Sequence, residues 1–235
     1  MVHYAYVKNI NSDSTYRYVI VFASRAVADE WWRAVSTSSN VKFSDSVRRV
    51  NAQFYTHDVS QANAANSLTT SGVATQFIGK VFFTLLNDLV GRGLSVIPST
   101  DCADYVSGNS FFIRSKVSPH EYWYCPLSSN SNATNSVYVS RTERTRFRVG
   151  ITDKDTEGTI MIGSDEIVIT LLTVNLSINV ADNSQVMLSS APESGLKFRD
   201  LLNKFTVGPT MYKDGQSLDM KELFSSGNGE EWELA

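Results

Sequence analysis

This chain of 235 residues lacks most of the features that assign a protein to a class. It has two cysteines and three histidines, and its 21 lysines and arginines against 24 aspartates and glutamates give a net charge of -3. So few cysteines exclude a disulfide-built scaffold, and without a positive excess we do not expect nucleic acid as a partner. No segment approaches the roughly 18 uncharged apolar residues of a membrane span, so the sequence predicts a soluble protein.

The N-terminus also lacks a targeting signal. Residues Met1 to Lys8 have neither the basic start nor the run of roughly 7 to 15 apolar residues that a signal peptide requires. We therefore expect a cytoplasmic protein, with secretion of a mature form left open. In a reducing compartment Cys102 and Cys125 are expected to be free thiols, and a single bridge between them is the alternative.

Catalytic and metal-binding motifs are missing as well. The sequence has no glycine-rich phosphate loop, nucleophile elbow or HExxH pattern, and His3, His57 and His120 are not at metal-ligand spacing. The stretch from Asp153 begins like an EF-hand loop, but its twelfth position is Ser164 instead of the bidentate glutamate, which favours an acidic turn. We expect a non-enzymatic protein with no catalytic residue, no cofactor and no metal site.

Strict alternation of apolar and polar residues is the strongest positive signal. Phe147 and Val149 share one face of residues 144–151, and Arg146 and Arg148 share the other. Such a period of two is typical of a sheet with one buried and one solvated face. The predicted strands span residues 2–9, 16–23, 94–98, 110–117, 121–126, 136–140, 144–151, 159–163, 166–173, 174–180, 185–189 and 231–234. Short polar turns between them predict antiparallel pairing in a mainly β (α+β) fold, which is a barrel, a trefoil or a sandwich.

A few short helices interrupt this pattern. Ser24 is a suitable N-cap for a helix at about 25–36, and two more helices are predicted at 197–205 and 217–224. Residues 75–90 fit either a helix or a buried strand, and we favour a helix.

One uncharged, polar stretch suggests a domain boundary. Residues 60–72 have the composition of a loop or linker. It would separate an N-terminal hairpin and helix region at 1–59 from an antiparallel β domain at 73–235. The alternative is one compact domain over 1–235.

An aromatic cluster beside a polar loop is the first candidate binding site. Tyr122, Trp123 and Tyr124 precede a serine-rich and asparagine-rich stretch that contains Asn130 and Asn132. Aromatic rings stack on sugar C-H faces while amides bond the hydroxyls, so this pattern predicts a lectin-like, carbohydrate-binding module. Trp32 is a further ligand-binding candidate, because it is turned away from the apolar face of its helix.

A row of arginines is the second candidate. Arg144, Arg146 and Arg148 lie about 7 Å apart along one strand face and suit phosphate, sulfate or carboxylate groups. This row and the helix at 25–36 would serve an anion-binding or phosphoinositide-binding scaffold. The alternative for the row is a solvated face whose arginines pair with acidic neighbours.

Two other functions stay open. Asp101, Asp104 and Glu121 would supply the acids of a hydrolase if two carboxyl groups met in a cleft. Exposed rings would instead cover a partner surface if the chain is a subunit of an assembly, so an oligomer is possible.

Overall fold

The computed structural model describes residues 1–86, 103–126, 135–153, 156–213 and 216–235, without the side chains of 212–217. Strands account for 41% of the chain and helices for 16%, which confirms the prediction of a mainly β fold. The predicted strand at 94–98 lies outside the described residues.

The chain consists of two compact units, Met1–Asp104 and Tyr105–Ala235. The division therefore follows Asp104. The 60–72 stretch lies inside the first unit, where it contains the 3-10 helix η1 (Ala64–Leu68) and where Ala64 and Ser67 are buried.

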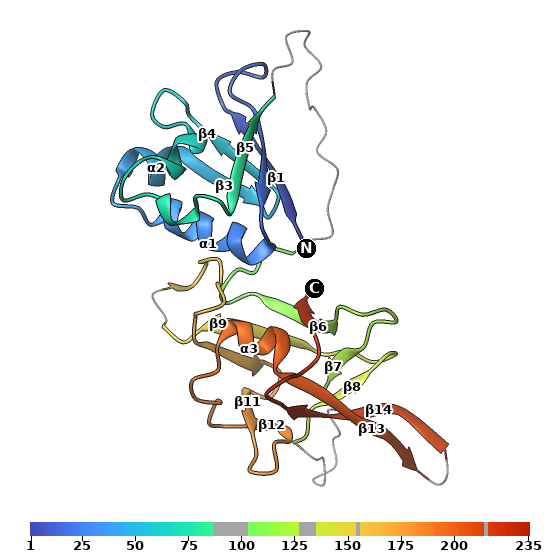
Figure 1. The fold of residues 1–235 in the computed structure, drawn as a ribbon. Helices are drawn as coiled ribbons and strands as arrows, with labels where there is room; N and C mark the ends of the chain where they lie inside the picture. Colours follow the sequence, from blue (N-terminus) through green and yellow to red (C-terminus); the bar gives the residue numbers. More distant parts are fainter. Residues whose placement is uncertain (87–102, 127–134, 154–155, 214–215) are drawn as a thin grey trace. The chain divides into compact units, whose positions relative to one another are not determined.

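The first unit is built on a five-stranded sheet in the order β3-β4-β1-β2-β5. The parallel pairing of β1 with β4 is flanked by antiparallel pairs. In the described residues of this unit, helices α1 and α2 and the 3-10 helices η1 and η2 accompany the sheet (Figure 1). The bounds are β1 His3–Asn9, β2 Tyr18–Phe22, α1 Arg25–Ser36, α2 Val41–Ser46, β3 Val47–Asn51, β4 Phe54–His57, η1 Ala64–Leu68, η2 Thr75–Phe77 and β5 Val81–Leu85.

Helix α1 forms as the sequence predicts. The Ser24 hydroxyl accepts a hydrogen bond from the Val27 backbone N-H at 3.2 Å, which caps the helix start. Trp31 is fully buried in the core of the first unit, and its indole N-H donates to the Ser67 hydroxyl at 3.1 Å. The helix thus covers one face of the sheet with its apolar side.

The helix favoured for residues 75–90 is wrong. Within residues 75–86, the part of this range that the structure describes, the chain makes the short η2 and then continues as β5, antiparallel to β2. Val81 is buried whereas Phe82 is 59% exposed, so the side chains alternate with a period of two. A run of apolar residues has no contrast between faces, and pairing with β2 decides its structure.

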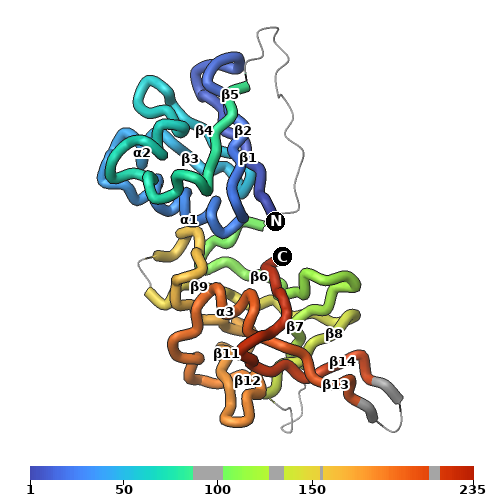
Figure 2. The backbone as a smooth tube through the Cα atoms, viewed as in Figure 1, coloured from blue at the N-terminus to red at the C-terminus, as the bar shows by residue number. Residues whose placement is uncertain are grey.

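The described residues of the second unit form one ten-stranded, antiparallel sheet that curls into a half-barrel. The order is β12-β11-β10-β9-β6-β7-β8-β14-β13, and β15 pairs with β6, so that the C-terminal end of the chain lies beside β6 (Figure 2). The bounds are β6 Ser110–Ser115, β7 Tyr122–Tyr124, β8 Tyr138–Ser140, β9 Arg146–Ile151, β10 Ile167–Leu171, β11 Leu176–Val180, β12 Val186–Ser189, α3 Phe198–Asn203, β13 Phe205–Lys213, β14 Gln216–Ser225 and β15 Trp232–Leu234.

Two sequence predictions for this unit are wrong, and one helix is confirmed. Residues 217–224 are strand β14 instead of a helix, because they pair with β13 and with β8. Residues 159–163 are mostly irregular instead of a strand, with one isolated bridge from Ile160 to Val106. The helix predicted at 197–205 is present as α3.

Candidate functional site

Trp123 is a core residue, so its prediction as a ligand-binding residue is not retained. Its side chain is fully buried, and its ring centroid lies 6.1 Å from that of Phe147, 5.0 Å from Phe205 and 5.9 Å from Trp232. All three pairs are edge-to-face, the arrangement that aromatic quadrupoles favour. These four rings, from β7, β9, β13 and β15, form a buried aromatic cluster in the half-barrel.

The neighbours of Trp123 lie on the opposite, solvated face, where they meet the arginine row. Register places Tyr122 beside Arg114 of β6, and Phe112 of β6 beside Arg146 of β9. Successive side chains of a strand point to opposite faces, so the burial of Trp123 brings Tyr122 and Tyr124 to the arginine side. We call the surface formed by six residues the guanidinium–aromatic face: Phe112, Arg114, Tyr122, Tyr124, Arg144 and Arg146.

Two arginines of this face rest on aromatic rings. The guanidinium carbon of Arg144 lies 4.5 Å from the ring centroid of Phe112 and 5.8 Å from that of Tyr122, and that of Arg146 lies 4.7 Å from Phe112. Phe112 and Tyr122 are themselves edge-to-face at 6.4 Å. Each cation–π contact is worth about 0.5–1 kcal/mol at an exposed site. The rings therefore restrain the guanidinium groups and leave their N-H donors available.

The arginines differ in their acidic partners. Arg114 forms an ion pair with Glu233 at 2.7 Å, and Arg148 pairs with Glu157 and donates to a backbone carbonyl. Arg144 and Arg146 are exposed and form no ion pair with any residue in the described part of the chain. The expected pairing of the row with acidic neighbours thus holds for Arg148 and not for the other two.

The other ligand-binding candidates do not join this face. Asn130 and Asn132 lie outside the described residues. Trp32 belongs to the first unit, where it packs against the core with its ring centroid 5.9 Å from that of Tyr55. Tyr122 and Tyr124 are the two candidates of the aromatic cluster that the structure brings together with the arginines.

The acids proposed for a hydrolase are occupied by ion pairs where the structure describes them. Glu121 of the second unit accepts from Arg141 at 3.1 Å and from Lys221 at 2.7 Å. Asp104 of the first unit accepts from Arg49 at 2.8 Å. Asp101 lies outside the described residues.

Asp104 belongs to a buried ionic cluster of the first unit. The Arg49 side chain is 3% exposed and donates to Asp29 at 2.8 Å, and Asp29 also accepts from Arg25 at 2.9 Å. The Tyr55 hydroxyl accepts from Arg49 at 3.2 Å. Burial raises the pKa of Tyr55 well above its usual range, so the phenol stays protonated. The ion pairs and the hydrogen bond of this cluster link α1, β3 and β4, so these charged groups stabilise the first unit.

Cys125 is a free, buried thiol, and Cys102, its partner in the alternative disulfide, lies outside the described residues. Burial raises the pKa of Cys125 to about 12, which suppresses the nucleophilic thiolate. Among the described residues, no three His, Cys, Asp or Glu side chains gather as metal ligands. None of the helices in the described ranges has the length and apolar character to cross a membrane.

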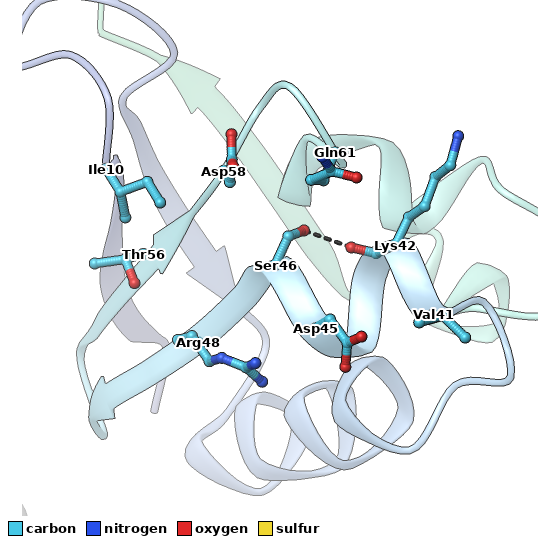
Figure 3. Close-up of a pocket in the computed structure, with 9 residues that line it drawn as sticks. All are labelled: Ile10, Val41, Lys42, Asp45, Ser46, Arg48, Thr56, Asp58 and Gln61. Carbon is cyan, nitrogen blue, oxygen red and sulfur yellow. Dashed lines mark hydrogen bonds between the residues drawn. The ribbon is translucent and has the colours of Figure 1, made fainter.

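A cavity of about 450 Å³ opens in the first unit between α2, β3 and the segment that follows β4 (Figure 3). One oxygen of its Asp58 carboxylate accepts bonds from Ser60 and Asn11, which lower the pKa of Asp58. Arg48 donates to the backbone carbonyl of the residue four positions earlier, and the Lys42 amine points away from the other lining residues. A lining with both signs of charge and local bonds defines no single ligand chemistry.

Phe112 and Arg114 are the members of the face that sequence reasoning missed. The sequence does indicate the face on which they lie, because the alternation in residues 110–117 places them opposite Phe111 and Ile113, which are buried. Their meeting with Tyr122 and Arg146 depends on register, which a single sequence does not give.

Comparisons with known protein families, with characterised proteins and with solved structures give no match to this chain.

Proposed function

We propose that the second unit is a non-enzymatic, lectin-like binding module for carbohydrate that carries carboxylate or sulfate groups. The observation that carries this proposal is the pair Arg144 and Arg146, whose guanidinium groups are exposed, rest on Phe112 and have no acidic partner among the described residues. Guanidinium groups held in place bind carboxylate and sulfate through two parallel hydrogen bonds.

Geometry supports a ligand with more than one acidic group. The guanidinium carbons of Arg144 and Arg146 both lie within 4.7 Å of one ring centroid, so they are separated by less than twice that distance. Two cations this close repel each other unless an anion lies between them. A chain of acidic sugars brings such anions together with apolar C-H faces.

The tyrosines supply the surface for those C-H faces. Tyr122 and Tyr124 are partly exposed on the same side of the sheet as the two arginines. Their rings offer flat apolar area and their hydroxyls offer hydrogen bonds, a combination common at carbohydrate sites. Neutral sugars would use the rings alone, whereas acidic sugars use the rings and the guanidinium groups together.

The test is a binding titration of the full chain with four probes. These are a sulfated oligosaccharide, a uronic-acid oligosaccharide, a neutral oligosaccharide of similar length, and vesicles that contain an anionic phosphoinositide. We expect binding to the two acidic sugars, and weaker binding as salt rises from about 0.05 M to about 0.15 M, because exposed charges are screened.

Matched substitutions locate the site. Arg146→Gln and Arg144→Gln should each raise the dissociation constant for the acidic sugars by about tenfold or more. The reason is that a hydrogen bond to a charged group is worth about 1.5–3 kcal/mol. Arg148→Gln is the control, because its guanidinium is already engaged by Glu157. The proposal fails if the wild type binds neither acidic sugar. It also fails if Arg148→Gln weakens binding to the acidic sugars as much as Arg146→Gln does. If the wild type binds the vesicles and no sugar, the face is a phosphoinositide site instead.

A further inference from the structure

The turn that leads into Arg144 is held by a single carboxylate from another strand. Asp219 of β14 accepts four hydrogen bonds on one oxygen, two from Thr142 and one each from Ser140 and the backbone N-H of Arg141, at 2.9–3.1 Å. The Ser140 hydroxyl in turn accepts from the backbone N-H of Thr142 and of Glu143. A carboxylate that gathers neighbouring N-H and O-H donors fixes the backbone of the turn that carries them.

The chain is fixed again immediately after Arg144. The backbone N-H of Thr145 donates to the Trp123 carbonyl at 3.0 Å, and the Thr145 hydroxyl accepts from the Cys125 N-H at 3.0 Å. Arg144 therefore lies between two anchored points, one at Asp219 and one at β7. With both ends held, its side chain has a restricted set of directions, and the one observed brings it over Phe112.

We propose that Asp219 is a positioning residue of the guanidinium–aromatic face, which holds the 140–143 turn so that the Arg144 guanidinium lies over Phe112 and Tyr122. This inference rests on the proposed function for its effect on ligand affinity, but its structural part does not. Asp219 acts through the turn, since the groups it bonds belong to Ser140, Arg141 and Thr142.

The charge of Asp219 is suited to this role. The Asp219 side chain is exposed; desolvation acts to raise its pKa, but the hydrogen bonds from Thr142 and Ser140 outweigh it and hold the pKa below its usual range. The carboxylate therefore stays ionised and acceptor-only at neutral pH. The nearby cations Arg141 and Lys221 bond to Glu121 instead, so they do not compete for Asp219.

The substitution Asp219→Asn tests the proposal, with Glu222→Gln as the matched control. Both remove one negative charge from β14, but the Glu222 carboxylate bonds to Gln185 and not to the turn. Two quantities are measured on the full chain: the side-chain Nε-H resonances of Arg144 and Arg146, which neighbouring rings displace, and the dissociation constant for the sulfated oligosaccharide.

We expect Asp219→Asn to move the Arg144 resonance toward its value in an unstructured peptide while the Arg146 resonance stays in place. The dissociation constant for the sulfated oligosaccharide should rise about tenfold, the factor that corresponds to the loss of one hydrogen bond to a charged group. Glu222→Gln should change neither quantity. An unchanged Arg144 resonance in folded Asp219→Asn protein would overturn the proposal.

The two proposals fail in different ways. If the wild type binds no acidic sugar, the binding function is wrong, and the Arg144 resonance still decides whether Asp219 positions the turn. If Asp219→Asn does not fold, Thr142→Ala replaces it, because this change removes one of the four bonds to Asp219 and keeps the carboxylate. It should shift the Arg144 resonance in the same direction by a smaller amount, and no shift would overturn the proposal.

Discussion

His57 should make the stability of the first unit depend on pH near neutrality. It lies fully buried at the end of β4, where its Nδ1 accepts a hydrogen bond from the Ala64 backbone N-H at 3.0 Å. Nδ1 therefore carries no proton, and Nε2 donates to the Tyr16 carbonyl at 2.8 Å. Burial lowers the pKa of His57, although the bond to Tyr16 acts in the opposite direction. A proton added at Nδ1 would face the N-H of Ala64.

The sign and size of the effect follow from this geometry. A histidine in the unfolded chain has a pKa of about 6.5. Below that pH the unfolded chain binds a proton at His57, whereas the folded chain keeps the imidazole neutral because its pKa is lower. The free energy of unfolding therefore decreases as the pH is lowered, by up to about 1.4 kcal/mol between about pH 7.5 and about pH 5.5. The carboxylates whose pKa is lowered, Asp13, Asp58 and Asp219, titrate below this window.

Urea unfolding of the full chain across that pH range measures the effect, with hydrogen exchange of the amides in α1 and β4 to report on the first unit. The pKa of His3 is also lowered by burial, so the informative quantity is the difference between the wild type and His57→Gln. We expect the variant to show the flatter pH dependence. Equal slopes for the two proteins would refute the assignment of a neutral, Nε2-protonated His57.

Three further predictions concern the core and the buried charges. Trp123→Ala should cost about 3–5 kcal/mol in the free energy of unfolding, because the ring is fully buried among three others, and a loss below about 1 kcal/mol would contradict its place in the core. Asp29→Asn should lower the free energy of unfolding by about 2–3 kcal/mol, less than the loss of a whole buried ion pair, because Arg49 keeps its bond to Asp104. As a control in the same denaturation assay, Asp13→Asn at an exposed ion pair should have no measurable effect. Cys125 should resist alkylation at neutral pH until the chain unfolds, as peptide mass mapping would show, and rapid labelling of the folded protein would be inconsistent with its burial.

The elements predicted well are those whose side chains contrast sharply from one face to the other. In β9 the arginines alternate with Phe147 and Val149, and the structure buries only the apolar pair. Helix α1 has a capping serine and an apolar stripe that includes Trp31, and it begins and ends where the sequence predicts. In both elements the local pattern and the tertiary environment favour the same structure.

The errors occur where local pattern carries little contrast. In β7 every residue is aromatic, so the alternation separates Trp123 from Tyr122 and Tyr124 but does not say which side faces the core. In β14 the conformation is set by pairing with β13 and β8, and β8 lies some 80 residues earlier in the chain.

The candidate site could be predicted only in part from the sequence, because its residues meet through the register of paired strands. Arg146 and Phe112 are distant in the sequence and become neighbours through the pairing of β6 with β9. From the sequence alone the arginine row and the tyrosines form two separate candidate sites, whereas in the sheet they share one surface. Hydrophobic pattern gives the faces of each strand, and only the paired sheet gives the neighbours.

The strand order of the first unit also bears on its synthesis. The hairpin of β1 and β2 is synthesised before the other strands of this sheet but occupies its middle, with β4 added on one side and β5 on the other. Until Leu85 has been translated, the backbone edge of β2 that β5 will cover has no strand beside it. A nascent chain that stops before this point exposes the unpaired N-H and C=O groups of β2, which are a template for pairing with another strand.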